Sequence, residues 1–304
     1  MNLSCGIVGL PNVGKSTLFN ALLRRQIAQV AEYPYTTIEP NVGVVEVPDE
    51  RLTKLADVIV GDPSTSLRTN RPQVIPAAIR FIDIAGLVKG AHQGEGLGNQ
   101  FLAHIREVDA ILHVVRAYEN VKVPHVHNKI DPKYDIEVVN LELELAGITK
   151  PVIYVLNVSE QDLKKDFDLP FNYIKICAKL EAELSALSEV DQMEYLKELG
   201  VEKSGLDQVI ISSYKLLNLI TFFTIAGGKM TQAWPVKVGT KMIEAAGLVH
   251  TDFAKGFITA EVINWQKLVE TGSWHNAKEK GLIHLAGRDE VVKDGYVVEF
   301  RFSV

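Results

Sequence analysis

The sequence contains few of the residues that cross-link a chain or anchor it in a membrane. Only two of its 304 residues are cysteines, Cys5 and Cys177, and they lie far apart. We therefore expect buried, reduced thiols rather than a disulfide or a metal ligand. No signal peptide precedes Leu3, and no apolar run approaches the roughly 18 residues that a membrane span needs. These absences predict a cytoplasmic protein with no membrane partner.

An excess of positive charge is also absent. Lysine and arginine number 32 against 38 acidic residues, which gives a net charge of −6. This balance predicts no direct DNA binding, but it is compatible with a local basic patch that meets RNA or a ribosome. The length allows two domains, and the 47% hydrophobic content is that of an ordinary globular protein.

The dominant motif is GLPNVGKS at residues 9–16. An apolar run at 5–8 predicts a strand before it, and residues 17–23 predict a helix after it. Strand, glycine-bounded loop and helix form a phosphate-binding P-loop, in which backbone N–H groups surround a polyphosphate. We expect Lys15 to reach the β- and γ-phosphates and Ser16 to bind Mg²⁺. The other P-loop residues expected at the nucleotide are Asn12, Val13, Gly14 and Thr17.

Two further segments contain residues suited to Mg²⁺ and the γ-phosphate. A polar, proline-bounded loop holds Thr37, which we favour over Thr36 as a second Mg²⁺ ligand, although spacing alone does not decide between them. A strand-like run at 76–86 ends in D-x-x-G. In a P-loop protein this Asp83 holds Mg²⁺, and the Gly86 N–H contacts the γ-phosphate.

The residue after Gly86 is Leu87, where many GTPases have the glutamine that orients the attacking water. Leucine cannot hydrogen-bond water, so hydrolysis is very slow or another group positions the nucleophile. The apolar run at 109–117 predicts a buried parallel strand, and we expect its His113 to be a satisfied interior residue. Beyond it, the loop histidines His125 and His127 are candidates on chemistry alone.

A strand at 150–157 ends in Asn157-Val158-Ser159-Glu160, where GTP-specific proteins have Asn-Lys-x-Asp. The lysine that covers guanine is replaced by Val158, and the acid is the longer Glu160. We therefore expect the preference for GTP to be lost, with ATP as the abundant alternative. A short strand at 173–176 leads into a turn at Cys177 and Ala178, which we expect to close over the base.

Residues 180–199 and 206–217 have helical patterns, and the chain then changes character. Aromatic residues in the last segment predict short strands, residues 252–257 predict a turn, and 297–302 predict a closing strand. We expect a small α+β domain with no catalytic constellation, suited to docking.

With these motifs, the chain resembles the Obg-like ATPases of the YchF type. The resemblance is nearly full length and rests on residues 9–16, 37–41, 83–91, 94–101, 157–160 and 250–257. It implies a mostly parallel P-loop sheet flanked by helices in residues 1–217, followed by a β-grasp-like TGS domain in 218–304. It also implies a slow, Mg²⁺-dependent ATPase that associates with ribosomes and acts in translation and stress responses.

The resemblance assigns two further roles. His125 corresponds to a loop histidine that replaces the missing glutamine, and His127 and His92 follow behind it as alternatives. The implied catalytic residues are therefore His125, Lys15 and Gly86. Asn12 is the residue type that coordinates an activating K⁺ in related GTPases. Two alternatives remain open: a GTPase of the translation-factor kind in which Asn157 and Glu160 still prefer guanine, and a nucleotide-stabilised binding module with negligible turnover.

One departure from the family concerns residues 133–149. Relatives have a long helical hairpin before the strand at Lys150, whereas only about twenty residues are present here, and residues 135–146 predict a single helix. A nucleic-acid or ribosome contact made through that hairpin is in doubt, but the nucleotide chemistry is unaffected.

Overall fold

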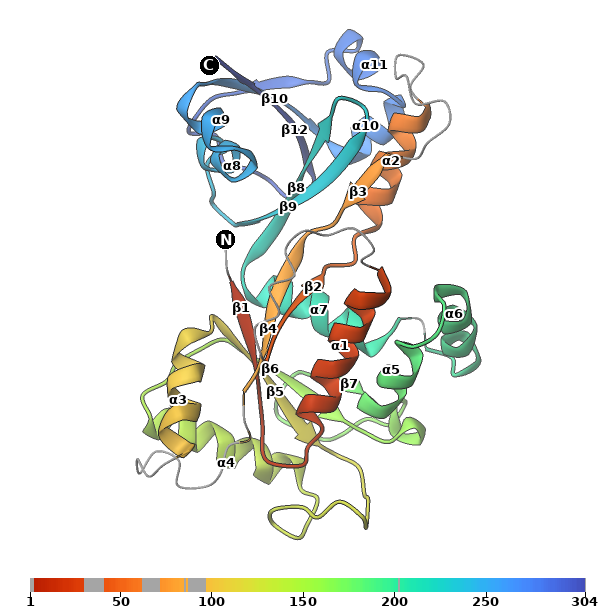
Figure 1. The fold of residues 1–304 in the computed structure, drawn as a ribbon, viewed down its shortest axis with the longest axis vertical. Helices are drawn as coiled ribbons and strands as arrows, with labels where there is room; N and C mark the ends of the chain where they lie inside the picture. Colours follow the sequence, from red (N-terminus) through yellow and green to blue (C-terminus); the bar gives the residue numbers. More distant parts are fainter. Residues whose placement is uncertain are drawn as a thin grey trace. The chain divides into compact units, whose positions relative to one another are not determined.

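The computed structural model describes residues 3–29, 41–61, 72–84, 86, 97–201 and 203–303. By their contacts the residues form two compact units (Figure 1). Asn2–Glu46 and Ile79–Leu217 make up the first unit, and Val47–Ala78 and Asn218–Val304 the second. The division expected from the sequence, 1–217 and 218–304, differs in one segment, because Val47–Ala78 groups with the C-terminal residues.

The first unit is built on a six-stranded sheet in the order β2-β4-β1-β5-β6-β7. Its strands are β1 (Ser4–Val8), β2 (Val42–Glu46), β4 (Ala78–Asp83), β5 (Ala110–Arg116), β6 (Val152–Asn157) and β7 (Tyr173–Ile176). β1 pairs in parallel with β4 and β5, and β5, β6 and β7 follow in parallel. The carboxyl ends of these strands therefore share one edge of the sheet, where α/β proteins bind ligands.

Helices flank this sheet on both sides. They are α1 (Lys15–Gln29), α3 (Leu97–Glu107), α4 (Pro132–Leu145), α5 (Ala178–Leu184), α6 (Glu189–Glu198) and α7 (Gly205–Leu216). Figure 1 shows α3 and α4 on one side of the sheet and α1 and α5 on the other. Covering both faces explains why β1 and β5 are buried along their whole length and read as continuous apolar runs.

The helix predicted at 180–199 is two helices. Helix α5 ends at Leu184, and α6 begins after Ser188, whose hydroxyl accepts a hydrogen bond from the Asp191 N–H. Serine competes for backbone hydrogen bonds and favours helix ends, so the interruption has a local cause. The break is a correction to the helical pattern read from the sequence.

Helix α4 connects to β6 directly through residues 146–151. Gly147 has a left-handed φ of 65°, the Gly147 N–H donates to the Glu144 carbonyl, and the Ile148 N–H donates to the Leu143 carbonyl. These two bonds satisfy carbonyls that a helix end leaves unpaired. The helix predicted at 135–146 is therefore confirmed in kind, and it ends in a capped turn.

The second unit contains a mixed six-stranded sheet in the order β11-β10-β12-β8-β9-β3. Its strands are β3 (Gln73–Ile75), β8 (Leu219–Ala226), β9 (Met230–Lys237), β10 (Phe257–Asn264), β11 (His284–Ala286) and β12 (Tyr296–Phe302). Its helices are α2 (Glu50–Gly61), α8 (Met242–Val249), α9 (Thr251–Lys255), α10 (Trp265–Thr271) and α11 (Trp274–Glu279). The predicted closing strand is confirmed as β12, whereas the turn predicted at 252–257 is mostly the short helix α9.

The core of the second unit lies between α8 and the sheet. Met242, Ala245 and Ala246 of α8 are fully buried against Phe222, Val262 and other strand residues. None of the described helices of either unit is long and apolar enough to span a bilayer.

Candidate nucleotide-binding site

The P-loop between β1 and α1 has a backbone that requires glycine. Gly9 and Gly14 have φ values of 156° and 101°, and Asn12 has a φ of 63°. A Cβ at Gly14 would collide with the Asn157 amide, and one at Gly9 would collide with the Val114 carbonyl. Only glycine fits both this conformation and this close packing.

The charge of Lys15 is held inside this loop. Its Nζ donates to the Leu10 carbonyl at 2.8 Å, and the residue is only 8% exposed. Burial lowers the pKa of Lys15 to about 8, against the opposing attraction of Asp83. A buried ammonium group gains most from a strongly anionic partner, as a phosphate would be.

Ser16 and Asp83 meet beside this lysine. The Ser16 hydroxyl donates to Asp83 Oδ2 at 3.0 Å. The other carboxylate oxygen, Oδ1, is buried and has no hydrogen-bond partner among the described residues. Burial raises the pKa of Asp83, and the Ser16 hydrogen bond and the Lys15 charge oppose that rise. A hydroxyl and a carboxylate with an unpartnered oxygen are the oxygen donors that Mg²⁺ prefers.

Gly86 lies next to Lys15 and the P-loop backbone. A Cβ on Gly86 would lie 3.1 Å from Lys15 Nζ and 3.2 Å from the Pro11 nitrogen, so its backbone borders the P-loop. The structure thus brings together Lys15, Ser16, Asp83 and Gly86, which lie apart in the sequence. Thr37, Leu87 and His92 lie outside the described residues.

Asn157, at the end of β6, links the P-loop to the start of α5. Its Nδ2 donates to the Val13 carbonyl at 2.9 Å, and its Oδ1 accepts from the Ala178 N–H at 3.0 Å. The residue is 4% exposed. Both ends of the amide are therefore used in holding the loop in place.

The neighbours of Asn157 differ in exposure. Val158 is 1% exposed and packs in a cluster with Val115, Ile136 and Leu156, whereas Glu160 is exposed at the start of a 3₁₀ turn. Cys177 precedes α5 as its N-cap, and burial raises the pKa of its thiol, with the Glu160 charge adding to the rise. Val158 thus contributes to the core instead of presenting a side chain to a base.

Arg116, at the end of β5, organises the loop that carries the candidate histidines. Its guanidinium is buried and donates to the carbonyls of Tyr118, Asn120 and Val123 at 3.0, 3.2 and 2.9 Å. The next residue, Pro124, accepts a hydrogen bond from Asn12 Nδ2 at 3.2 Å. The loop is therefore fixed to the P-loop one residue before His125.

His125 itself is directed at α4. Its Nε2 lies 2.9 Å from Asp135 Oδ2, and its Nδ1 accepts a hydrogen bond from the His127 N–H at 3.2 Å. These contacts assign the ring proton to Nε2 and occupy both nitrogens. A catalytic role for His125 stays a prediction, and it requires one of these contacts to open.

Sequence reasoning did not find Asp135, which the structure places at the centre of this cluster. Its second oxygen lies 3.2 Å from His127 Nδ1. The only signal was an acidic residue near the start of a predicted helix. His113 is interior as predicted, but its Nδ1 has no hydrogen-bond partner among the described residues, and burial lowers its pKa to about 3.

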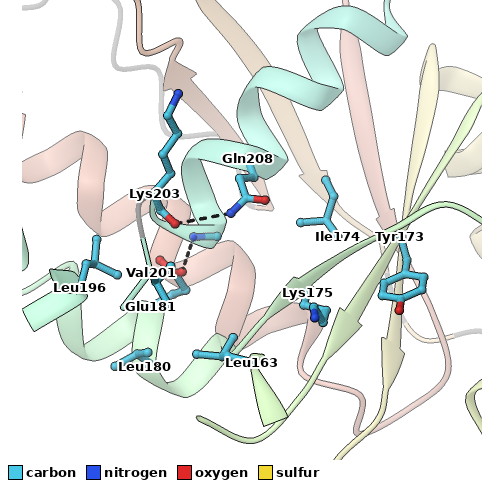
Figure 2. Close-up of a pocket in the computed structure, with 11 residues that line it drawn as sticks. Leu163, Tyr173, Ile174, Lys175, Leu180, Glu181, Leu196, Val201, Lys203 and Gln208 are labelled. Atoms are coloured by element: carbon cyan, nitrogen blue, oxygen red, sulfur yellow. Dashed lines mark hydrogen bonds between the residues drawn. The ribbon is translucent and has the colours of Figure 1, made fainter. Parts of the chain in front are cut away.

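A separate cavity of about 180 Å³ lies between β7, α5 and α7 (Figure 2). On its wall the Glu181 carboxylate accepts hydrogen bonds from Ser204 Oγ and the Gly205 N–H, which start α7. Burial raises the pKa of Glu181, and these bonds oppose the rise. None of the P-loop residues lines this cavity, so we do not assign the nucleotide to it.

The loop geometry, the buried lysine and the Ser16–Asp83 pair define a P-loop nucleotide-binding protein. A family model described as 50S ribosome-binding GTPase matches residues 4–158, and the YchF-GTPase_C model, described as a protein of unknown function, matches residues 219–303. The chain belongs to the YchF family.

Individual relatives agree with this assignment. The chain is 40% identical over 378 aligned residues to the ribosome-binding ATPase YchF of Bacillus subtilis (strain 168), with full coverage of both chains. It is 39% identical to the protein of the same name from Escherichia coli O157:H7, again with full coverage.

Solved structures agree with the predicted fold. The structure of the Schizosaccharomyces pombe YchF GTPase has a TM-score of 0.81 and 30% identity, and the match covers 99% of this chain and 98% of that one. A GTP-binding protein from Pyrococcus horikoshii OT3, at 16% identity and a TM-score of 0.58, shares the fold. The predicted fold, a mostly parallel P-loop sheet followed by an α+β domain, is confirmed.

Proposed function

We propose that this protein is a Mg²⁺-dependent switch that binds ATP, hydrolyses it slowly and associates with the ribosome in translation and stress regulation. The observation that carries the proposal is the phosphate end of the site, where Lys15, Ser16 and Asp83 converge. The printed names of the bacterial relatives, ribosome-binding ATPases, support the same function.

The choice of ATP over GTP rests on the residues expected to face the base, 157–160, which we call the base end of the site. The S. pombe relative is called a GTPase and the bacterial relatives ATPases, so their names do not agree. In this chain the Asn157 amide is used within the protein, Val158 is buried, and the exposed acid Glu160 is longer than the usual aspartate. These features weaken the recognition of guanine, so the more abundant ATP becomes the working ligand.

Each residue of the site has a role in binding or hydrolysing ATP. P-loop N–H groups and Lys15 neutralise the phosphates, and a Mg²⁺ held by Ser16, Asp83 and Thr37 would supply further positive charge there. Gly86 reports the γ-phosphate through its N–H, and His125 orients the attacking water. Asn12 donates its amide N–H to Pro124, so its amide oxygen is the atom it would offer to K⁺.

The docking role belongs to residues 218–304, which we propose are a TGS domain. We further propose that the family's helical hairpin is missing near residues 133–149. The alignment with the B. subtilis relative spans 378 positions against 304 residues here, a difference of 74, and the capped turn at Gly147 closes α4 within this stretch. We propose a cytoplasmic location and expect neither a membrane nor a DNA partner.

The first test is equilibrium binding of ATP and GTP in the presence of Mg²⁺. We expect ATP to bind as tightly as GTP or more tightly. A tenfold preference for GTP, about 1.4 kcal/mol, would place the protein among the GTPase switches instead.

The second test is the turnover of the His125→Ala variant. We expect a clear loss of turnover with nearly unchanged ATP affinity, and no loss for His104→Ala, an exposed histidine of α3. Equal turnover would remove His125 from the mechanism. Single-turnover hydrolysis no faster than that of free ATP would leave only a nucleotide-stabilised binding module.

A further inference from the structure

His125, His127 and Asp135 form a compact cluster with three possible metal ligands. Each offers one atom, and these atoms lie within 4.8 Å of one another. His125 Nε2 is 2.9 Å from one carboxylate oxygen of Asp135, and His127 Nδ1 is 3.2 Å from the other. The distances between ligand atoms in a tetrahedral zinc site are similar, about 3.3 Å for bonds near 2.0 Å.

The chemistry of the three groups selects a kind of ion. Two imidazoles and one carboxylate suit zinc and neighbouring transition metals, whereas Mg²⁺ prefers oxygen ligands. Two neutral rings and an ionised carboxylate also have one net negative charge in a mostly buried place, which favours a dication. We propose that His125, His127 and Asp135 bind Zn²⁺ or a similar transition-metal ion, with a fourth position left for water.

The protons of the cluster balance without release. In the hydrogen-bonded state Nε2 of His125 and Nδ1 of His127 are directed at Asp135 and carry the ring protons. A metal ion takes these two positions, and each ring shifts its proton to its other nitrogen. Bonds to the ion replace the two ring N–H contacts with Asp135. His125 also gives up the 3.2 Å hydrogen bond that its Nδ1 accepts from the His127 N–H, because that nitrogen now carries the proton.

The surroundings hold the ligands near the required positions. Arg116 fixes the loop before His125, and Asp135 lies in the first turn of α4. The side chains of His125 and Asp135 are 3% and 2% exposed, but that of His127 is 23% exposed, which gives an ion a route to the site. Tyr134 packs edge-on against the His127 ring, with ring centroids 4.9 Å apart.

One consequence rests on the proposed function. If His125 orients the attacking water, an ion bound to its Nε2 would withdraw it from that role. Micromolar Zn²⁺ would then slow ATP turnover by holding His125 against α4.

The site is tested with Co²⁺ and Zn²⁺ on the full chain, stripped of metal by a chelator and kept in Mg²⁺ without nucleotide. We expect one ion per chain with micromolar or tighter affinity, and for Co²⁺ the intense visible absorption of four-coordination. His127→Asn and Asp135→Asn should each weaken binding at least tenfold. His127→Asn is the safer variant, because His127 is partly exposed. The control His284→Ala removes the exposed pair that His284 forms with Glu290 at 2.8 Å and should change nothing.

Two results would overturn the site: no stoichiometric binding, or equal affinity in His127→Asn and the unchanged protein. Either would leave the cluster as a hydrogen-bonded anchor only. The metal-binding assay contains no nucleotide, so it can fail while the proposed function stands. The catalytic role of His125 is tested separately, by the turnover of His125→Ala in protein freed of transition metals.

Discussion

At the two ends of the proposed nucleotide site, the phosphate end and the base end, polar groups are used in opposite ways. At the phosphate end Lys15 is charged at a cost, which appears as a pKa lowered to about 8, and Asp83 has a buried oxygen without a partner among the described residues. At the base end the Asn157 amide donates one hydrogen bond and accepts another within the protein, and Val158 is part of the core.

This difference distinguishes the groups that would bind the ligand from the groups that hold the loop in shape. Polar groups that are poorly solvated in the free protein gain free energy when a ligand supplies the missing charge, because their desolvation has already occurred. Groups that already make hydrogen bonds within the protein hold the loop in shape and have less to gain from a ligand. We therefore expect affinity to come mainly from the phosphate end, and mutations at the two ends to differ in kind.

The largest effect is expected for Lys15→Met. ATP affinity should fall about 100-fold, or about 2.7 kcal/mol, because a charge-assisted contact to phosphate is lost. The free protein should melt at a higher temperature, because a desolvated ammonium group is removed. Calorimetric titration and thermal unfolding measure the two effects, with the exposed Lys129→Met as control. A lower melting temperature would contradict the cost we assign to burying Lys15.

The next effect is a pH dependence of binding. The pKa of Lys15 is lowered from 10.5 to about 8 in the folded protein, so ATP affinity should be constant below pH 8. Above pH 8 it should fall by up to tenfold per pH unit as the ammonium form is lost. Between about 8 and 10.5 the unfolded chain binds more protons at this residue, so its contribution to the free energy of unfolding rises with pH. Lys15→Arg, which stays charged, should flatten the binding profile.

A smaller effect on binding, shared by both nucleotides, is expected for Asn157→Ala. The change leaves the Val13 carbonyl and the Ala178 N–H buried without their partner, which should cost about 1–3 kcal/mol of unfolding free energy. ATP and GTP affinities should fall by the same factor, because the amide supports the loop and does not read the base. Asn140→Ala, which removes a half-buried hydrogen bond to Tyr154, is the control. Selective loss of GTP binding would show that Asn157 reads guanine.

The smallest effect is expected for Glu160→Asp. Shortening the exposed acid moves the motif towards the guanine-specific pattern, but Val158 stays in the core and supplies no cover for a base. We expect the ratio of GTP to ATP affinity to rise about threefold, or about 0.65 kcal/mol. Competition of both nucleotides for a labelled analogue measures this ratio, with Glu198→Asp on α6 as an exposed control. A tenfold rise in this ratio would contradict the small effect and would show that Glu160 is the main determinant of base specificity.

Features of the site that depend on a few neighbouring residues could be predicted from the sequence. The P-loop follows from its own glycines, and the ends of β4 and β6 could be located because apolar runs stop at Asp83 and Asn157. Strands of a parallel sheet end at one edge, so these residues were expected to meet the P-loop. The Ser16–Asp83 hydrogen bond agrees with that expectation.

Features that depend on distant partners could not be predicted. The pairing of His125 with Asp135 requires the particular path of the loop that Arg116 fixes, and no periodicity encodes that path. Strand β3 has three residues, too few for an alternating pattern, and its partner β9 begins at Met230. The break between α5 and α6 is an exception, because its cause is local: Ser188 competes for backbone hydrogen bonds, but the longer helical pattern around it conceals the break.

Strand β3 lies at the end of its sheet and pairs in parallel with β9. A fragment that starts at Asn218 would lack it, and β9 would become an open edge with a row of unpaired backbone groups, which promotes aggregation. The C-terminal fragment should therefore be poorly soluble when produced alone. A synthetic peptide of residues 72–78, added in trans, offers the same backbone partner and would rescue it by strand complementation.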